Sequence, residues 1–478
     1  MPATGVATKR VVLMTTAAFL QETLKLTAHP LQRAGAYAIA TLAGVSGPET
    51  VTGDQFRAVV SRMIDDLITT STVVKGQPGW YLLGVSYVLW PNCALHYESK
   101  RTPTGITTWR TCPPADRWPA VPCTLCGRPA AAWYGKGDVP LGASIEHRNT
   151  TAPDHEGTPL CFPCVTSFHA LPYACTAGGG LLNGIHTWDA RFMARITRSE
   201  VRDNLRGMVA RGDLKGGGGT FALEFAALKA LRWWDHRVTA GVQTLQFSNN
   251  NQDQKLQSEV MEQPLAEWLR STVRHSERRS GFRYLAHAQA TAKVSGLRML
   301  AWRAFHHPEQ IASRATGWLR EQILNPPKHA APGSIPAAVT PLAPLIRSYL
   351  VEVLNVLEPD VAHVVGVARR IADVVADDDT RLKKFTVATR RPHDLKAWLK
   401  AEIADWSRKR PADAENEPFI SVRQWRVLFD SGNASWSARE LLFVATFEEL
   451  ATRGAKVAAV EEGTSHEDFK ILDTDDQD

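Results

Sequence analysis

The stretch that decides the fold, TPLCFPCVTSFHALPYACTAGGG, runs from Thr158 to Gly180 and places Cys161 and Cys164 around a Phe-Pro pair. Cys123 and Cys126 have the same CxxC spacing, and 34 residues separate the two pairs. Each CxxC turn directs two thiolates at one point, so two turns close a tetrahedral four-sulfur site with no open coordination position. The sequence therefore predicts a structural zinc site made by these four cysteines. Free thiols or redox chemistry are the alternatives.

Composition and charge limit the class of protein. The chain has 478 residues, of which 44% are hydrophobic and 22% charged, as expected for a soluble globular protein with several packed units. No apolar run approaches the roughly 20 residues needed to cross a bilayer, so we expect no membrane partner. Seven cysteines are too few for a secreted disulfide framework, so we expect a cytoplasmic protein. The net charge of +6 does not by itself indicate a nucleic-acid partner.

The organisation along the chain indicates an α+β fold. We expect a mixed N-terminal region over 1–285 with an inserted four-cysteine zinc module at about 111–180, an all-α helical bundle over 286–460 and an acidic disordered tail over 461–478. The module is dense in Pro, Gly and Cys, which predicts that something other than a hydrophobic core holds it. Gly79–Asn92, GWYLLGVSYVLWPN, is rich in aromatic and β-branched residues, which predicts a strand.

Later segments have clearer periodicity. The spacing predicts a helix from Thr187 to about Val209, and Val242–Met261 is expected to form two strands around a polar loop. Beyond about Arg283 the sequence predicts helices at 285–305, 309–324, 342–357, 361–376, 394–409, 421–430 and 436–453.

The segment between the cysteine pairs raises an enzyme alternative. HNH-type nucleases place a base-like histidine before their second knuckle, and residues of suitable type are Glu146, His147, Asn149, His155 and His169. The pattern departs from that motif, because no Asn stands shortly before the second pair and His169 comes five positions after Cys164. The explanation we favour is that these are polar loop residues and that His169 lies in a helix following the second pair. The alternatives to a non-enzymatic protein are thus a nuclease that uses His147, and a zinc-containing transcription regulator, for which no helix-turn-helix is evident.

The stretch Leu160–Met193 resembles the CXXC-CXXC large subunits of type I CRISPR surveillance complexes (Cascade). In that family the second knuckle is followed by a helix, an Ala-Leu-Pro step, a glycine-rich turn, a strand carrying a histidine and a further helix. The matching parts here are Ala170–Pro172, Gly178–Gly180, His186 and the run from Trp188.

Two further stretches are similar to that family. LWPNCAL (Leu89–Leu95) is similar to its aromatic-Pro-Asn-small turn, and FSNNNQ (Phe247–Gln252) is similar to its Phe-Thr-Asn-Ser-Gly-Gln loop, with Ser248 and Asn251 as departures. The resemblance covers residues from about 25 to 270 in consistent order, whereas the C-terminal part matches only in being helical.

The resemblance implies a role without catalysis. A large subunit of this kind lies at the 5′ end of the guide RNA complex, recognises the protospacer-adjacent motif on target double-stranded DNA, helps to part the strands and recruits a helicase-nuclease. The implied partners are therefore the guide RNA, the backbone and 5′-handle subunits, a small helical subunit, target DNA and the helicase-nuclease effector.

Arginines at helical spacing are the first candidate contacts to nucleic acid, and they are Arg191, Arg195, Arg198, Arg202 and Arg206. Steps of three and four residues place them along one helical face, where they could follow a phosphate backbone. The alternative is a solvated face balanced by Asp189, Glu200 and Asp203.

Other candidates lie in the polar loop and in two basic clusters. Asn249, Asn250 and Asn251 could contact base edges, and Lys255 a phosphate; an ordinary polar hairpin is the alternative. Arg278 and Arg279, and Lys383 and Lys384, belong to basic stretches interleaved with aromatic residues, a composition that suits a displaced single strand. Tryptophans that fill helix interfaces are the alternative for the aromatic residues.

Overall fold

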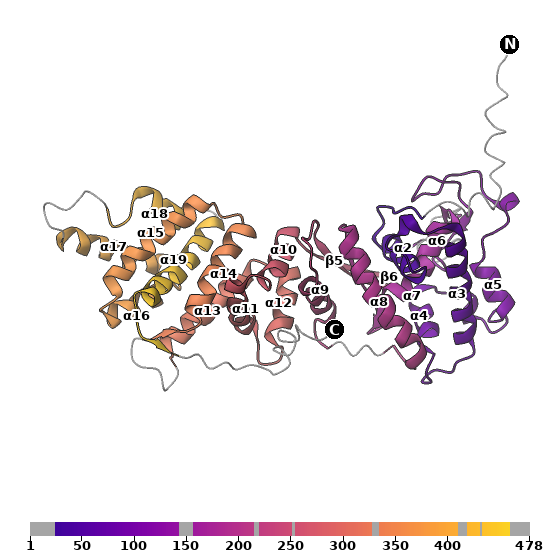
Figure 1. Ribbon diagram of the computed structural model, residues 1–478, viewed down its shortest axis with the longest axis horizontal. Helices are drawn as coiled ribbons and strands as arrows, with labels where there is room; N and C mark the ends of the chain where they lie inside the picture. The colour runs from indigo at the N-terminus through magenta and orange to yellow at the C-terminus, as the bar shows by residue number, and fades with distance from the viewer. Residues whose placement is uncertain are drawn as a thin grey trace, which may run out of the picture. The chain divides into compact units, whose positions relative to one another are not determined.

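The computed structural model in Figure 1 describes residues 24–142, 156–214, 219–250, 254–326, 334–409, 418–430 and 433–458. The chain forms two compact units. The first comprises Met1–Gly219 and Ala240–Val260, and the second comprises Thr220–Thr239 and Met261–Asp478. The expected acidic tail at 461–478 lies outside the described residues.

In its described residues, the first unit is made of helices and two antiparallel sheets. Its α-helices are α2 (Pro30–Leu42), α3 (Gly53–Ser71), α4 (Tyr81–Leu89), α5 (Pro103–Arg110), α6 (Phe162–His169), α7 (Leu171–Ala174) and α8 (Ala190–Ala210). Its 3₁₀ turns are η1 (Pro48–Thr50), η2 (Ala94–His96) and η3 (Ala115–Arg117). The helix predicted from Thr187 is thus confirmed as α8.

The larger sheet holds four strands in the order β3-β4-β5-β6. Its strands are β3 (Thr176–Gly178), β4 (Leu181–Thr187), β5 (Val242–Asn249) and β6 (Gln254–Met261). In the antiparallel pairing of β4 with β5, Ile185 lies opposite Thr244. The two strands predicted around the polar loop are confirmed. The smaller sheet pairs β1 (Ala132–Tyr134) with β2 (Thr158–Leu160).

Several helices begin where the sequence supplies a cap. Thr52 and Gln55 form a reciprocal capping box at the start of α3. The Asp189 carboxylate accepts a 3.0 Å hydrogen bond from the backbone N–H of Phe192 at the start of α8. Pro30 occupies the first turn of α2, where its missing N–H would have no partner in any case.

The prediction of a strand at Gly79–Asn92 is wrong, because the segment forms α4. Every residue from Tyr81 to Ser86 is buried, so the run shows no alternation between a buried and an exposed face. Its aromatic and β-branched composition reflects burial on all sides, since α4 contacts α3, α8, β4 and β5. Pro91 follows the helix, and Asn92 adopts a left-handed φ of 63° at the turn.

A close helix crossing holds the second cysteine pair against α2. A Cβ atom on Gly35 of α2 would lie 1.7 Å from the carbonyl oxygen of Ser167 on α6, so only glycine allows this approach. Gln32, which is fully buried, donates to the Ser167 hydroxyl at 3.4 Å and accepts from the Thr27 hydroxyl at 2.9 Å. The two helices are therefore joined through backbone contact and a buried polar network.

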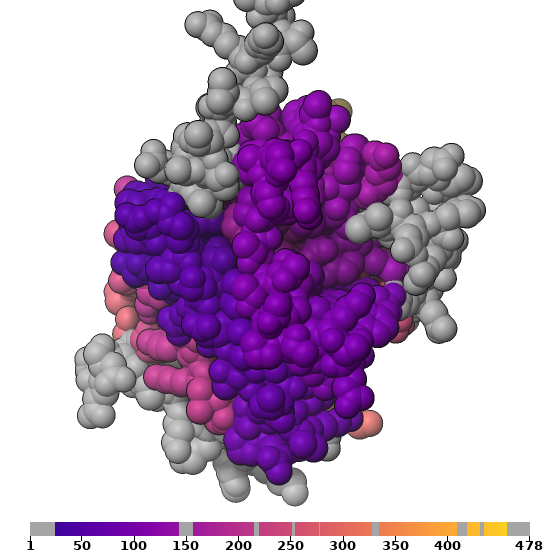
Figure 2. Space-filling model, turned by 90° about the vertical axis from the view of Figure 1, so that its right-hand side faces the viewer, coloured from indigo at the N-terminus to yellow at the C-terminus, as the bar shows by residue number. Residues whose placement is uncertain are grey.

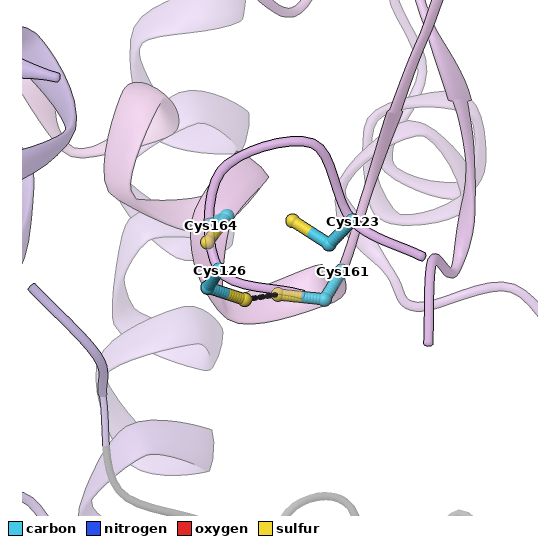
Figure 3. A group of neighbouring side chains, drawn as sticks. All are labelled: Cys123, Cys126, Cys161 and Cys164. Atoms are coloured by element: carbon cyan, nitrogen blue, oxygen red, sulfur yellow. Dashed lines mark hydrogen bonds between the residues drawn. The ribbon is translucent and has the colours of Figure 1, made fainter. Parts of the chain in front are cut away.

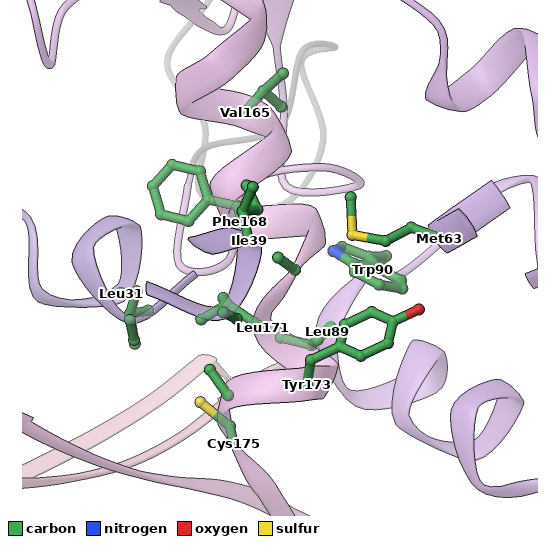
Figure 4. Packing of buried hydrophobic residues seen from close by; sticks show 14 of the residues in the cluster. Leu31, Ile39, Met63, Leu89, Trp90, Val165, Phe168, Leu171, Tyr173 and Cys175 are labelled. Carbon is green, nitrogen blue, oxygen red and sulfur yellow. The ribbon is translucent and has the colours of Figure 1, made fainter. Parts of the chain in front are cut away.

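The core of the first unit surrounds α6 and α7, as Figure 4 shows. Phe168, Leu171 and Tyr173 are each 1% exposed or less and pack with Trp90 and Leu89. The expectation that something other than a hydrophobic core holds residues 111–180 is therefore wrong for the α6–α7 segment, whose apolar side chains are central to that core. Figure 2 shows a face of the molecule formed by indigo and purple segments of this unit.

In its described residues, the second unit is helical apart from two short strands. Its helices are α9 (Ala222–Arg232), α10 (Gln263–Thr272), α11 (Ser276–Gln289), α12 (Gly296–His306), α13 (Gln310–Leu324), α14 (Val339–Glu352), α15 (Glu358–Val375), α16 (Asp379–Ala388), α17 (Pro392–Lys409), α18 (Val422–Phe429) and α19 (Asn433–Thr452). The strands β7 (Ile335–Pro336) and β8 (Val457–Ala458) pair in parallel. Across the described ranges, each helix is too short or too polar to span a lipid bilayer.

Two sequence predictions for this unit need correction. The boundary expected near residue 285 falls within the second unit, because α10 and α11 pack against α14 while α9 packs against α12. The single helix expected at 285–305 is divided into α11 and α12. A Cβ atom on Gly296 would lie 2.0 Å from the carbonyl oxygen of Ala286, so the chain turns back closely at this point.

Helix α19 lies at the centre of the C-terminal part of this unit. It contacts α13, α14, α15 and α18, and its Phe443 and Phe447 are buried. Arg320 of α13 forms a 3.3 Å ion pair with Glu440 of α19, and its guanidinium carbon lies 4.5 Å from the centroid of the Phe443 ring. The expected helical character of the C-terminal half is confirmed.

Candidate metal centre and nucleic-acid surface

A tight turn carries the first cysteine pair, Cys123 and Cys126. The backbone N–H of Cys123 donates to the carbonyl oxygen of Arg128 at 2.6 Å, and that of Gly127 donates to the carbonyl oxygen of Cys123 at 2.9 Å. Gly127 has a φ of 76°, in the left-handed region that glycine enters without steric cost. Gly127, directly after the second cysteine of the pair, therefore allows the tight turn that brings Cys123 and Cys126 together.

The second pair lies at the start of α6. Cys161 is the N-cap residue, and its carbonyl oxygen accepts from the backbone N–H of Val165 at 3.2 Å. Cys164 lies in the first turn, next to Pro163, which a helix tolerates at this position. The partial positive charge of a helix N-terminus favours the thiolate form of cysteines placed there.

The four sulfur atoms converge on one point. The Sγ atoms of Cys123, Cys126, Cys161 and Cys164 all lie within 4.8 Å of one another, and those of Cys126 and Cys161 are 3.5 Å apart. Figure 3 shows the four side chains pointing toward a common centre. Four thiolates around a zinc ion at about 2.3 Å would be separated by roughly 3.8 Å, so the donor set fits a tetrahedral metal ion. The predicted convergence of the two pairs is confirmed.

Backbone pairing fixes one knuckle to the other. The backbone N–H of Thr124 donates to the carbonyl oxygen of Pro159 at 2.9 Å, and the backbone N–H of Ala131 donates to the carbonyl oxygen of Leu160 at 2.8 Å. Three of the sulfur-bearing residues are buried, and Cys126 is partly exposed. A set of four sulfur donors, all supplied by the protein, is typical of structural metal centres.

Mutual hydrogen bonding shifts the thiol pKa values in opposite directions. Hydrogen bonds from Cys126, Cys161 and Cys164 hold the pKa of Cys123 below its usual value. Hydrogen bonding with Cys123 raises the pKa values of Cys161 and Cys164 well above the usual range, and burial adds to the rise. Four neighbouring thiolates repel one another, and a divalent metal ion would supply positive charge that stabilises them together.

The other three cysteines lie apart from this cluster. Cys93 and Cys175 are buried, and Cys112 is partly buried, as expected for core or loop residues. Burial raises the pKa of Cys93 to about 11 and that of Cys112 to about 12, so both remain thiols at neutral pH.

A buried polar network lies at the far end of α6. The Asp138 carboxylate accepts a 2.8 Å hydrogen bond from the Trp109 indole and lies 3.2 Å from His169 Nε2. Arg110 lies between two indoles, with its guanidinium carbon 3.6 Å from the Trp109 centroid and 4.0 Å from that of Trp90. Burial lowers the pKa of His169 to about 4, so its ring is neutral at physiological pH.

This network bears on the nuclease alternative. His169 is 6% exposed and bonded to Asp138, so it is not available as a base for a DNA substrate in this conformation. Glu146, His147, Asn149 and His155 lie outside the described residues. His169 is thus a buried histidine of α6, in agreement with the expectation that it lies in a helix after the second cysteine pair.

Four arginines form an exposed row on α8. Arg191, Arg195, Arg198 and Arg202 are exposed, while Phe192, Met193, Ile196 and Val201 of the same helix are buried. Within the described ranges, none of these four arginines forms an ion pair. The helical spacing predicted from the sequence is therefore present, with the cationic face outward.

The acids that could balance this row have other partners. Asp189 caps α8 through the N–H of Phe192. Glu200 accepts a 2.9 Å hydrogen bond from the Thr176 hydroxyl, and burial raises the pKa of its carboxyl group. Asp203 pairs with Arg206 at 3.7 Å. The arrangement leaves the positive charge of the row largely uncompensated by its own helix.

The polar loop does not behave as one contact surface. Asn249 is fully buried: its Nδ2 donates to the carbonyl oxygens of Leu89 and Lys136, both at 2.6 Å, and its Oδ1 accepts from the N–H of Leu141 at 3.0 Å. The prediction that Asn249 contacts nucleic acid is wrong for this conformation, because these bonds use both ends of its amide. The side chain instead joins β5 to α4 and to the segment after the first knuckle.

The neighbours of Asn249 are placed differently. Asn250 and Lys255 are exposed, and both have contacts within the protein. Asn251 lies outside the described residues. Nucleic-acid contact by these three residues stays a prediction.

The four candidate cations of the second unit are two arginines that have partners within the unit and two exposed lysines. Arg278 forms a 2.6 Å ion pair with Glu352, and Arg279 Nε donates to the carbonyl oxygen of Val273 at 2.9 Å, so both have partners within the unit. Lys383 and Lys384 of α16 are exposed. Trp398, which follows them in the sequence, packs against Phe385 with ring centroids 5.0 Å apart, as the helix-interface alternative expects.

The pairing of Arg33 with Trp188 could not be predicted from the sequence. The guanidinium carbon of Arg33, on α2, lies 4.7 Å from the centroid of the Trp188 ring, just before α8. Arg33 occurs in an apolar helix far from Trp188 in the sequence, and no local motif links the two residues. The contact exists because α2 packs against α8.

Comparison with known proteins does not assign a family. The sequence matches no protein-family model, and no curated protein is significantly similar to it.

Proposed function

We propose that this chain is a non-enzymatic nucleic-acid-recognition subunit, the large subunit of a type I CRISPR-guided DNA surveillance complex, with a structural zinc ion held by its four clustered cysteines. In this role it recognises the protospacer-adjacent motif on target duplex DNA, aids strand separation and recruits a helicase-nuclease. Its partners are the guide RNA and the other subunits of the complex. The family assignment rests on the resemblance of Leu160–Met193 and its flanking stretches.

The observation that carries the nucleic-acid role is the exposed arginine row of α8. Its four guanidinium groups lie on one face, and the acids of the same helix have other partners. Each arginine that neutralises a phosphate of duplex DNA releases counterions, so affinity should fall with salt at a logarithmic slope of roughly −0.9 per contact. A set of unpaired cations on a rigid helix is suited to positioning a nucleic-acid backbone.

The cysteine centre supports a structural use of metal. All four donors are sulfur, three of the four residues are buried, and the two knuckles are joined by backbone pairing. A thiolate-only set selects a soft or borderline metal such as zinc over magnesium or calcium. The ion would hold the turn of Cys123 against the start of α6, and through α6 it would support α2 and α8.

The first experiment is purification of the tagged chain after expression with the rest of its operon. We expect a guide RNA and other subunits to co-purify. Recovery of the chain free of RNA and of other subunits, under conditions that preserve the metal, would contradict the proposal.

The arginine row has its own test. Binding of duplex DNA by the assembled complex is measured across a series of salt concentrations for the wild type and for the double variant Arg195→Gln, Arg198→Gln. The magnitude of the logarithmic salt slope should fall by about 2. Arg57→Gln is the matched control, because Arg57 is also exposed on a helix of the first unit but pairs with Asp54. An unchanged slope in the double variant would remove the row from the interface.

The nuclease alternative predicts a different outcome. Incubation of the purified chain with DNA and a divalent metal ion should give no cleavage if the proposal holds. Cleavage that is abolished by His147→Ala would favour an HNH-like enzyme instead.

A further inference from the structure

Trp188 is the most exposed tryptophan in the described part of the first unit. Its side chain is 53% exposed although it lies between the buried end of β4 and the capped start of α8. Because a strand and a helix flank Trp188, its indole is held in place although it does not pack in the hydrophobic core. The position therefore offers a large apolar surface at low conformational cost.

Two buried side chains hold the indole from within. Arg33 places its guanidinium carbon 4.7 Å from the ring centroid, and the His186 imidazole meets the ring edge-on at a centroid distance of 4.9 Å and an angle of 88°. His186 is fully buried, and its Nδ1 lies 3.2 Å from Gln243 Oε1, which orients the imidazole. The ring is thus supported from the protein side and open to solvent elsewhere.

The guanidinium group of Arg33 lies next to the indole, and its Nε has no hydrogen-bond acceptor. The side chain is 7% exposed, and its Nε is buried with no hydrogen-bond partner. Among the described residues no carboxylate pairs with this guanidinium. Desolvation by burial lowers the pKa of His186 to about 4, so the positive charge beneath Trp188 comes from Arg33.

The arginine row of α8 begins next to this indole. Arg191 and Arg195 are exposed in the first two turns of the helix, and neither has an ion-pair partner within the described part of the chain. A solvent-open aromatic ring beside several unpaired guanidinium groups has the chemistry of single-strand binding grooves, in which bases stack on aromatic rings and cations follow the phosphates. A duplex would not use the ring in this way, because its base faces are already stacked on one another.

We propose that Trp188 is a stacking platform for an unpaired base of a single-stranded nucleic acid, whose flanking phosphates are bound by Arg191 and Arg195. The inference rests on the proposed nucleic-acid role and adds to it a ligand state and a specific contact. Arg33 holds the indole from the protein side, and the base stacks on the surface that remains open.

The test uses the full-length metal-loaded chain and a short labelled oligothymidine, with binding followed by fluorescence anisotropy. Trp188→Ala should weaken binding by about 5- to 150-fold, the effect of losing one base–aromatic stack. The salt slope should stay unchanged, because no cation is removed. Trp188→Phe should restore most of the affinity. The matched control is Trp233→Ala, since Trp233 is 46% exposed and belongs to the second unit, whereas the row belongs to the first.

A second measurement does not depend on truncating the indole. Saturating oligothymidine should quench the tryptophan fluorescence of the wild type more than that of Trp188→Phe. A duplex of the same length should not produce this difference.

Failure of the inference and failure of the proposed function are distinguishable. If Arg195→Gln with Arg198→Gln weakens oligothymidine binding but Trp188→Ala leaves it unchanged, the stacking platform is wrong and the cationic surface stands. Equal losses for duplex and single strand in Trp188→Ala would also overturn the stacking. If the wild type binds neither form and the assembled complex is equally insensitive to the row, both proposals fail.

Discussion

The Sγ atoms of Cys126 and Cys161 lie 3.5 Å apart, although 35 positions separate the two residues in the sequence. The contact joins the turn that carries the first cysteine pair to the start of α6. Because both residues belong to a set of four mutually close sulfurs, the turn and the helix are joined by a shared centre that a metal ion fits. Loss of one sulfur should therefore affect the whole surrounding fold.

Removal of one thiol should lower metal content and stability together. In Cys161→Ser we expect less than one metal ion per chain and a lower yield of folded protein, because metal binding contributes folding free energy at such sites. Cys112→Ser should change neither property, since Cys112 lies outside the cluster. Elemental analysis and thermal unfolding measure both variants. A Cys161→Ser protein that keeps full metal content and stability would contradict the assignment.

Metal uptake by the metal-free chain should release protons. The pKa values of Cys161 and Cys164 are raised by hydrogen bonding with Cys123, so both thiols are protonated at pH 7 before the ion binds. We expect about two or more protons per ion, and an apparent affinity that falls as the pH is lowered. Calorimetry in buffers of different ionisation enthalpy gives the proton count. Release of no protons would mean that these thiols do not bind the ion.

Acidification should destabilise the protein in part through His169. Burial lowers its pKa from 6.5 to about 4, so between these values the unfolded chain binds a proton that the native chain does not. The free energy of unfolding should therefore fall as the pH drops from about 6.5 to about 4. At 1.36 kcal/mol per pKa unit, the contribution of this group at pH 5 is about 2 kcal/mol at most.

The variant His169→Gln removes this titration and can still donate a hydrogen bond to Asp138. Its loss of stability between pH 7 and pH 5, measured by urea unfolding, should be smaller than that of the wild type. His393→Gln, at a residue whose side chain is 92% exposed, is the control and should follow the wild type. An identical pH dependence in His169→Gln and the wild type would argue against a neutral buried histidine.

The crossing of α2 and α6 should tolerate no side chain at Gly35. Its added Cβ would meet the Ser167 carbonyl oxygen at 1.7 Å, so Gly35→Ala must push the two helices apart. We expect a loss of about 1–3 kcal/mol or more. Gly317→Ala, in a helix of the second unit with nothing within 4 Å of the added Cβ, should instead gain about 0.5–1 kcal/mol. Denaturant unfolding distinguishes the two, and equal effects would refute the close approach.

Asn249 should prove to be a structural residue. Its replacement by Ala leaves the carbonyl oxygens of Leu89 and Lys136 and the N–H of Leu141, which are buried or partly buried, without their present partner. At about 1–3 kcal/mol for each unsatisfied group, the loss of stability should be several kcal/mol. Asn250→Ala, at an exposed position, should change the unfolding free energy by about 0.5 kcal/mol or less. A stable Asn249→Ala protein with weakened nucleic-acid binding would restore the sequence-based prediction.

The features of the candidate site that could be predicted from the sequence are those that depend only on residues close together in the chain. A CxxC turn needs only four residues to orient two thiols, and the row on α8 follows from steps of three and four residues in a helix. Both features are present in the structure. The strand predicted at Gly79–Asn92 is wrong because the same composition suits a buried strand and a helix buried on all sides. Only the contacts of α4 with two helices and two strands distinguish these possibilities.

The sequence by itself determined the donor set, the helical spacing of the arginines and the helical character of the C-terminal half, because each depends on residues close together in the chain. Tertiary structure alone decided that Asn249 is buried, that residues 220–239 join the second unit, and that Arg33 lies over Trp188. These outcomes depend on which distant surfaces pack together, and packing is set by the shapes of whole helices and sheets. A local pattern carries no information about a neighbour 155 positions away, so such contacts emerge only when the chain is folded.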